Sequence, residues 1–220
     1  MKKSLKIMSA AMSSIMVLSL AACGGSDAGT TAVQDTTKAA ASEAKESSDA
    51  QAAGETYTVG ICQLVQHDAL DAATEGFKDA ITEALGADAV TFDEQNAQGD
   101  SNTCSTIINS FVSNDVDLIL ANATAALQAA QAGTSEIPVL GTSVTEYGVA
   151  LGIDDFNGTV GGNISGTSDL APLDEQAAML NELFPDAKTV GLLYCSAEAN
   201  SQYQVDTVKA ALEELGYTCE

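Results

Sequence analysis

The side chains best suited to chemistry in this sequence are a single histidine, His67, and five cysteines. A catalytic histidine needs a nucleophile and an orienting carboxylate within reach. Asp68 and Asp71 are close to His67 in the sequence, but serines are distant. The cysteines are scattered and lack the spacing of metal ligands. The pattern therefore favours neither an enzyme, a metal site nor a cofactor, and His67 is either a ligand contact or a solvated loop residue.

One cysteine has a chemistry that its neighbours suggest. Cys23 follows a lysine-rich start and a mostly apolar run, residues 7–20, which is the layout of a secretory signal. That run is shorter than the roughly 20 apolar residues that span a bilayer. The sequence LAAC at 20–23 resembles the bacterial lipobox, in which the thiol is alkylated with diacylglycerol and the chain is cut before it. We expect residues 1–22 to be a signal peptide and the lipid on Cys23 to anchor the chain to the cell membrane, outside the cytoplasm. The alternative is an ordinary signal peptide whose cysteine is incidental.

A second group of side chains could bind a small molecule without reacting with it. In parallel α/β proteins, ligands bind beyond the carboxyl ends of the strands, where helix N-termini offer free N–H groups. The polar residues expected at those ends, and hence the predicted ligand-binding residues, are Gln63, His67, Asn122, Thr124, Thr142, Ser143, Thr145, Ser196, Glu198 and Asn200. Most are uncharged, which suits a small zwitterion or polar solute better than a phosphate.

The basic residues limit how such a ligand could be held. All eight are lysines, so no guanidinium can pair with a carboxylate as a fork. An acid group would be held by main-chain amides and hydroxyls, such as those at 123–124 or 143–145, assisted by a helix dipole. An ammonium group would need an acceptor, for which Asp169 and Glu198 are candidates. Asp169 and the threonines of these segments could instead be helix caps.

These residues must be positioned by alternating strands and helices. Apolar periodicity predicts strands at 57–64, 89–95, 116–121, 137–141 and 189–195, and helices at 69–85, 101–113, 125–132, 173–184 and 200–215. This order indicates a parallel sheet with right-handed crossovers. Residues 154–169, rich in Gly, Asn, Ser and Thr, are expected to form a hinge or loop. Their sequence does not match the dinucleotide-binding fingerprint.

The same pattern divides the chain into parts. Residues 23–56 have almost no large apolar side chains and are expected to be a disordered tether. Residues 57–168 are expected to form lobe 1 and residues 169–220 the first part of lobe 2. The sequence stops as another strand opens near Tyr217, so lobe 2 is expected to be incomplete, either as a fragment or by truncation. The net charge of −23 argues against a nucleic-acid partner.

Several segments carry a specific resemblance. VGICQLVQHDALDAATEGFKDAI, IPVLGTSVTE, ISGTSDLAP and PDAKTVGLLYCSAEANSQYQV resemble the substrate-binding lipoproteins of ABC transporters of the tryptophan/tyrosine uptake type. The resemblance runs from residue 57 to the end. It implies a type I periplasmic-binding fold, with two Rossmann-like lobes that close on a small ligand and deliver it to a permease. It also implies that the rest of lobe 2 lies outside this sequence.

The function expected from these observations is that of a lipid-anchored, monomeric receptor for an ABC importer, binding an aromatic or other hydrophobic amino acid. The lobes would close about residues 157–168. A sugar or nucleoside receptor of the same fold is the main alternative, and a surface-anchored enzyme or a structural lipoprotein are weaker ones. Tyr147 and Phe156 are interpreted as packing residues rather than as a stacking wall for the ligand.

Two of the remaining cysteines could react with each other. Cys62, near the end of the first predicted strand, and Cys104, in the first turn of the following helix, fall on the same side of the sheet. A disulfide is allowed outside the cytoplasm, so both a bridge and buried free thiols remain open. Cys195 and Cys219 are expected at opposite ends of neighbouring parallel strands and should not pair.

Overall fold

The computed structural model describes residues 54–220. The predicted signal peptide, the lipid-modified Cys23 and nearly all of the predicted tether lie outside the described residues. The elements of the described part form two parallel sheets, which belong to one unit, Asp49–Glu220.

The first sheet contains five parallel strands in the order β2-β1-β3-β4-β5. Their bounds are Tyr57–Gln63 for β1, Val90–Asn96 for β2, Leu118–Asn122 for β3, Val139–Val144 for β4 and Ile164–Ser168 for β5. The central strands β1 and β3 are the most buried strands of this sheet. Their sequences are apolar because helices cover both faces of a parallel sheet.

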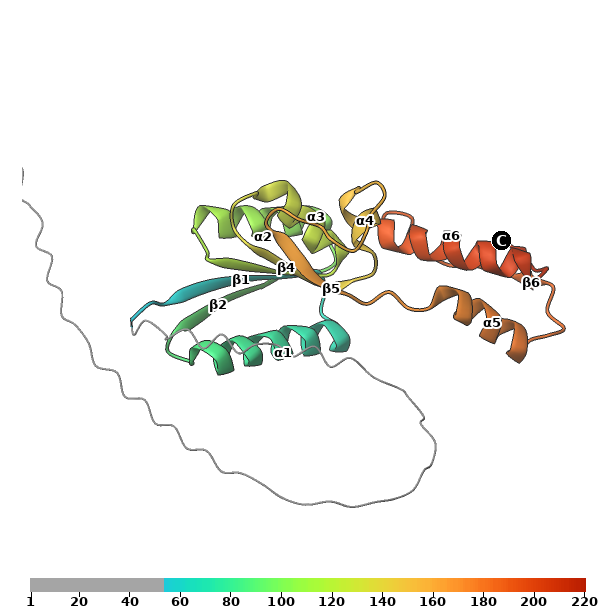
Figure 1. Ribbon diagram of the computed structural model, residues 1–220, viewed down its shortest axis with the longest axis horizontal. Helices are drawn as coiled ribbons and strands as arrows, with labels where there is room; N and C mark the ends of the chain where they lie inside the picture. Colours follow the sequence, from blue (N-terminus) through green and yellow to red (C-terminus); the bar gives the residue numbers. More distant parts are fainter. Residues whose placement is uncertain (1–53) are drawn as a thin grey trace, which may run out of the picture. The chain divides into compact units, whose positions relative to one another are not determined.

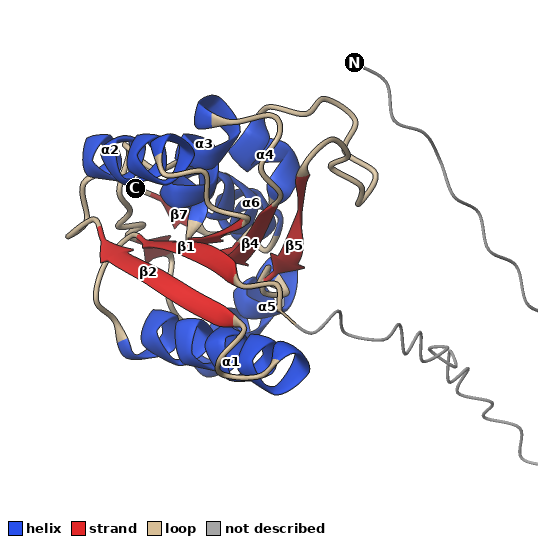
Figure 2. Cartoon of the chain, turned by 90° about the vertical axis from the view of Figure 1, so that its left-hand side faces the viewer, coloured by secondary structure: helices blue, strands red, loops and turns tan. Residues whose placement is uncertain are grey.

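Helices lie on both faces of this sheet, as Figures 1 and 2 show. Helix α1 (Asp68–Leu85) covers one face. The other face is covered by α2 (Ser101–Ser113), α3 (Thr124–Gly133) and the short α4 (Tyr147–Leu151). Each face has its own core, because successive strand residues point to opposite sides.

The two cores show which face each strand residue occupies. Val59, Ile61 and Leu120 are buried with Phe77 of α1. Cys62 and Ile119 belong to the larger core beneath α2, α3 and α4. Strand positions therefore alternate between an α1 face and an α2 face, and this alternation decides below which strand-end residues can meet.

The second part of the chain has a smaller sheet. Helix α5 (Leu173–Leu183) precedes β6 (Thr189–Val190), and α6 (Ala199–Glu214) connects β6 to the parallel strand β7 (Thr218–Cys219). Ala177, Leu212 and Tyr217 form its core. Tyr217, the residue before β7, also donates a hydrogen bond from its hydroxyl to Asn181 Oδ1 of α5 at 3.0 Å.

The structure corrects three expectations about local structure. Residues 164–168 are a strand, β5, rather than part of a hinge, so the crossover to α5 is confined to residues 169–172. The apolar signal was weak because β5 is an edge strand with only Ile164 buried. Helix α4 was not predicted, being only five residues long. The strand predicted at 189–195 pairs only at Thr189–Val190.

Candidate ligand-binding site

A pocket of about 270 Å³ lies between the carboxyl edge of the five-stranded sheet and the start of α6. We call it the interlobe pocket. Its lining residues are Leu64, Gly99, Ser101, Ala123, Thr124, Ala125, Gln128, Ser143, Cys195, Ala197, Glu198, Ala199 and Asn200. Pockets at this edge of a parallel sheet are the usual ligand sites of open α/β folds.

Three helices begin at the interlobe pocket. Helices α2, α3 and α6 start at Ser101, Thr124 and Ala199, and each of these residues lines the pocket. The first N–H groups of a helix have no partner within the helix, and the helix dipole places partial positive charge there. The pocket is therefore suited to a negatively charged group, although its lining contains no lysine.

The capping of these helices decides which N–H groups remain for a ligand. Asp100 caps α2, because its carboxylate accepts a hydrogen bond from Thr103 N at 2.7 Å. Hydrogen bonds from Thr103 and Asn102 lower the pKa of Asp100. Within residues 54–220, no side chain caps the N-terminus of α3 or of α6. The start of each of these two helices can therefore donate to a ligand carboxylate.

The backbone of the pocket wall is unusual at two positions. Ala123, which precedes α3, has φ 95°, and Ser143 in β4 has φ 55°, both rare for residues with a side chain. The register between β4 and β5 shifts between Gly141 and Val144. Such an irregularity re-aims a side chain, and here Ser143 lines the interlobe pocket. Strained backbone of this kind is concentrated at binding sites.

Glu198 supplies the negative charge of the pocket. It precedes α6, and its Oε2 accepts a hydrogen bond from Ser201 Oγ at 2.8 Å. This bond fixes the carboxylate at the end of the pocket that belongs to the second part of the chain. A fixed carboxylate beside two open helix N-termini presents an acceptor and donors in one cavity, which matches the two charges of a free amino acid.

The structure brings together four of the predicted site residues: Thr124, Ser143, Glu198 and Asn200 all line the interlobe pocket. The prediction missed Gly99 and Ser101 after β2, as well as Gln128. The sequence Asp100-Ser101 at the start of a predicted helix was a usable signal for a capped N-terminus at the sheet edge. Gln128 gave no such signal, and its side chain donates to Ala150 O at 2.9 Å.

Gln63 and Asn122 lie instead in a buried polar network on the α1 face. Gln63 Nε2 donates to Asp71 Oδ1 at 2.6 Å, and Thr74 donates from its hydroxyl to Gln63 Oε1 at 2.7 Å. Asn122 Nδ2 donates to Leu70 O at 2.8 Å and to Thr74 Oγ1 at 3.0 Å. These bonds hold α1 against β1 and β3. In residues 54–220, Asn122 Oδ1 is the buried side-chain oxygen that has no hydrogen-bond partner.

The other predicted residues are also placed away from the interlobe pocket. His67 is exposed and caps α1, its Nδ1 accepting from Ala69 N at 3.2 Å. Thr142 lines a different cavity, with Ala73 and Phe77 of α1. Thr145 is buried, and its carbonyl accepts a hydrogen bond from Ser168 Oγ at 2.7 Å. Ser196 is exposed, next to the pocket residue Ala197.

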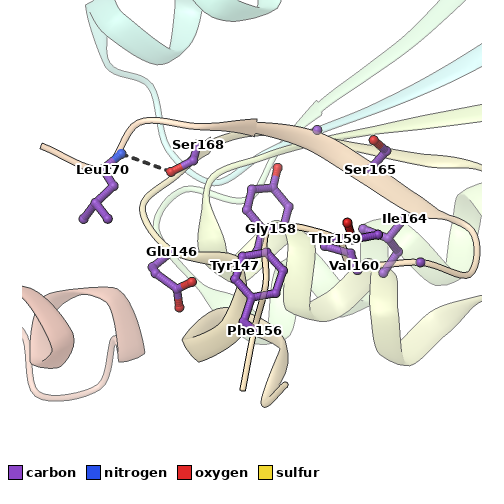
Figure 3. Close-up of a pocket in the computed structure, with 12 residues that line it drawn as sticks. Glu146, Tyr147, Phe156, Gly158, Thr159, Val160, Ile164, Ser165, Ser168 and Leu170 are labelled. Atoms are coloured by element: carbon purple, nitrogen blue, oxygen red, sulfur yellow. Dashed lines mark hydrogen bonds between the residues drawn. The ribbon is translucent and has the colours of Figure 1, made fainter. Parts of the chain in front are cut away.

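A larger cavity of about 700 Å³ follows the open edge of β5 (Figure 3). Tyr147 and Phe156 line it, and the charged side chain of its lining, Glu146, already has partners. Both carboxylate oxygens of Glu146 accept from backbone amides of α4, and Ser168 Oγ donates to Thr145 O and accepts from Leu170 N. This cavity lies along an edge strand and not at the carboxyl ends of the strands, so we regard the smaller interlobe pocket as the candidate site.

Tyr147 acts as a packing residue in that region. It is 5% exposed, and its hydroxyl donates to Thr167 O at 3.2 Å. Burial and the negative charge of Asp169 raise the pKa of Tyr147 to about 12. The side chain therefore stays neutral at physiological pH and links α4 to β5, in agreement with its interpretation from the sequence.

Residues 54–220 contain no group of three or more His, Cys, Asp or Glu side chains that could hold a metal ion. Among the helices of the same residues, none is both long and apolar enough to cross a bilayer.

Comparison with known proteins gives one family match and one curated relative. Residues 58–220 match the family model described as ABC transporter substrate binding protein. The chain is 38% identical over 161 residues to a protein of Clostridioides difficile (strain R20291) named "Tyrosine-binding protein". That alignment covers 72% of this chain and 46% of the relative, so the chain spans about half the length of the protein it matches.

Solved structures are also similar to this chain. An ABC domain in complex with L-Trp from Streptococcus pneumonia is 34% identical, with a TM-score of 0.70, and the match covers 76% of this chain and 56% of that one. The ligand-free, open structure of a substrate-binding protein with adhesive properties from Clostridium difficile is 38% identical, with a TM-score of 0.58, over 75% of this chain and 56% of that one.

Proposed function

This chain belongs to the family of ABC transporter substrate-binding proteins, and from this premise we propose that it is part of a receptor that delivers an aromatic amino acid to an ABC importer. The observation that carries the proposal is the interlobe pocket, where two helices begin without a side-chain cap beside one fixed carboxylate. No catalytic step is assigned to it.

The pocket supports a specific mode of binding. The ligand carboxylate accepts hydrogen bonds from the first amides of α3 and α6, at Thr124 and Ala199, and from the Ser143 hydroxyl. The ligand ammonium is held by Glu198. This arrangement needs no arginine, which fits a chain whose basic residues are all lysines.

The names of the relatives support an aromatic ligand. One is called a tyrosine-binding protein, and one structure was solved with L-Trp. In the interlobe pocket, Leu64 and the alanines supply apolar surface beside the polar groups. Some of the residues that would flank an aromatic ring are expected to lie in the part of the relatives' length that this chain does not span.

Location and partners follow from the proposed role. Binding proteins of ABC importers work outside the cytoplasm, so we propose that Cys23 carries the lipid anchor and that residues 24–56 tether the binding unit to the membrane. The partners are the amino acid and the permease of the importer, and the receptor acts as a monomer. A labelled lipid precursor that is incorporated into the wild type but not into Cys23→Ser would test the anchor.

Ligand release and capture would depend on movement between the part of the chain that holds the five-stranded sheet and the part that begins with α5. The pocket takes residues from both, and the described crossover between them is the short segment 169–172. A ligand that contacts both sides binds the closed arrangement better than the open one and therefore shifts the equilibrium towards closure.

Ligand identity is tested by calorimetric titration of the complete mature protein with the aromatic amino acids, leucine, ribose and adenosine. We expect saturable binding of tyrosine, tryptophan or phenylalanine. Binding of ribose or adenosine alone would replace the proposal with the sugar or nucleoside alternative. Failure of every amino acid to bind would refute it.

The role of Glu198 gives the first prediction. Removing its charge in Glu198→Gln should weaken amino-acid binding about 10- to 100-fold, because a charge-assisted hydrogen bond to the ammonium is lost. Binding of the corresponding α-hydroxy acid, which has no ammonium, should change little. Titration calorimetry measures both.

A matched control removes the same charge elsewhere. Glu182 is exposed at the end of α5, away from the residues that line the pocket. Glu182→Gln should leave the dissociation constant unchanged. If both variants weaken binding equally, the effect comes from net charge and not from a contact with the ammonium.

A further inference from the structure

Two buried thiols meet in the core beneath the interlobe pocket. Cys62 of β1 and Cys104 of α2 are both fully buried and belong to the same core cluster. Both are free thiols in the structure. A side-chain interaction with Cys104 and burial raise the pKa of the Cys62 thiol. The two residues are far apart in the sequence, so their contact is made by the fold.

The geometry of β1 and α2 explains the contact. A Cβ atom placed on Gly60 would lie 2.7 Å from the ring of Phe111, so this part of β1 faces α2. Cys62 is two residues further along the strand and points to the same face. Cys104 lies about two helical turns before Phe111. Since a helix that crosses over between parallel strands runs back against them, Cys104 arrives opposite Cys62.

We propose that Cys62 and Cys104 form a disulfide bond in the secreted protein, linking α2 to β1 below the interlobe pocket. The proposal rests on the extracytoplasmic location of the proposed function, because that environment permits disulfides. A metal ion is not an alternative use of the pair, since no third ligand accompanies it among residues 54–220.

The reaction is a thiol–disulfide exchange with a disulfide oxidant, either a small molecule or an oxidoreductase. The thiolate of one cysteine attacks a sulfur of the oxidant, forms a mixed disulfide and releases one thiol. The second thiolate attacks the mixed disulfide and releases the other thiol. The two cysteines lose two electrons and two protons, and the oxidant is reduced to two thiols. Because both sulfurs are sealed in the folded core, the exchange takes place during folding.

Differential alkylation of the complete secreted protein tests the bond directly. The protein is denatured without reductant and labelled with N-ethylmaleimide, then reduced and labelled with iodoacetamide before peptide mapping. We expect Cys62 and Cys104 to carry the second label, and a linked peptide pair to be found before reduction. Cys195 and Cys219, which are less buried, should carry the first label. First-label modification of Cys62 and Cys104 would overturn the proposal.

Stability provides an independent measurement. Complete reduction of the wild type should lower the Tm by about 10 °C, because the bond closes a loop of more than forty residues. The Tm of Cys62→Ala/Cys104→Ala should not respond to reductant, whereas Cys195→Ser/Cys219→Ser should respond like the wild type. An unchanged Tm of fully reduced wild type would contradict the proposal. None of these readouts depends on the identity of the ligand.

Discussion

Asp100 controls the start of α2 at the rim of the interlobe pocket. Its carboxylate accepts hydrogen bonds from the first turn of the helix, which lowers its pKa. A group whose pKa is lowered by folding stabilises the folded state above its unfolded pKa of about 4. That contribution is lost as the pH falls through the lower pKa of the folded state.

This gives a prediction about pH. Asp100→Ala should melt below the wild type at pH 7, because α2 loses its cap. The difference in Tm should shrink as the pH is lowered below about 4. Asp100→Asn keeps a capping oxygen that does not titrate, so its Tm should be closer to that of the wild type at pH 7. Equal melting of Asp100→Ala and the wild type at pH 7 would show that the cap is unimportant.

The strand-end residues show how far a site can be read from a sequence. Gln63, Asn122 and Thr142 all lie on the α1 face of the sheet. Ser143 lies on the other side and lines the pocket. Sequence reasoning located the correct edge of the sheet but treated both faces as equivalent. The alternation of residues along β1 and β3 could have shown which side chains point to each face. The shift in register beside Ser143 could not have been anticipated, because it depends on pairing with β5.

At the level of elements, β4 and β5 approach each other closely at Gly166. A Cβ atom on Gly166 would collide with the backbone oxygen of Gly141 and with the hydroxyl of Tyr147. Because a backbone atom cannot move aside as a side chain can, β5 would have to separate from β4. Gly166→Ala should therefore lower the free energy of unfolding by about 1–3 kcal/mol, as measured by urea denaturation.

Gly191 provides the control for this change. It is also exposed, but a Cβ atom there would meet nothing within 4 Å. Gly191→Ala should change the free energy of unfolding by less than about 0.5 kcal/mol. If the two variants are equally stable, β5 is not held against β4 in the way described.

Most helices and central strands were predictable because their apolar residues recur with a clear period. Helix α2 was predicted with the bounds that the structure gives, Ser101–Ser113. Strand β5 was not, since a mostly exposed edge strand of glycine, serine and threonine has no apolar signature. Its position depends on backbone hydrogen bonds to β4, which a single sequence does not display.

For the whole molecule, the α/β fold with parallel sheets was predicted from apolar periodicity and the family from the resemblance of long segments. The family match and the structural similarities confirm both. The division into lobes 57–168 and 169–220 remains a prediction, as do the signal peptide, the tether and the anchor. The chain spans only about half of its relatives, and composition and periodicity carry no information about residues beyond the sequence.

The large negative charge leads to a prediction at this scale. With a net charge of −23, the folded protein is destabilised by repulsion among its carboxylates. Salt screens this repulsion, so the Tm of the complete protein should rise between low ionic strength and about 0.5 M NaCl. Potassium chloride should act in the same way. A Tm that falls with either salt would show that favourable ion pairs dominate instead.

The uncapped starts of α3 and α6 have a consequence for the proposed receptor when no ligand is bound. Each presents the positive end of a helix dipole to the same small space, where Glu198 is the negatively charged side chain of the lining. In the proposed binding mode, the ligand carboxylate would add a second negative group that both helix starts attract. If the proposed function is right, the ligand itself would help to hold the two helix starts together, and a solute without an anionic group would not make this contact.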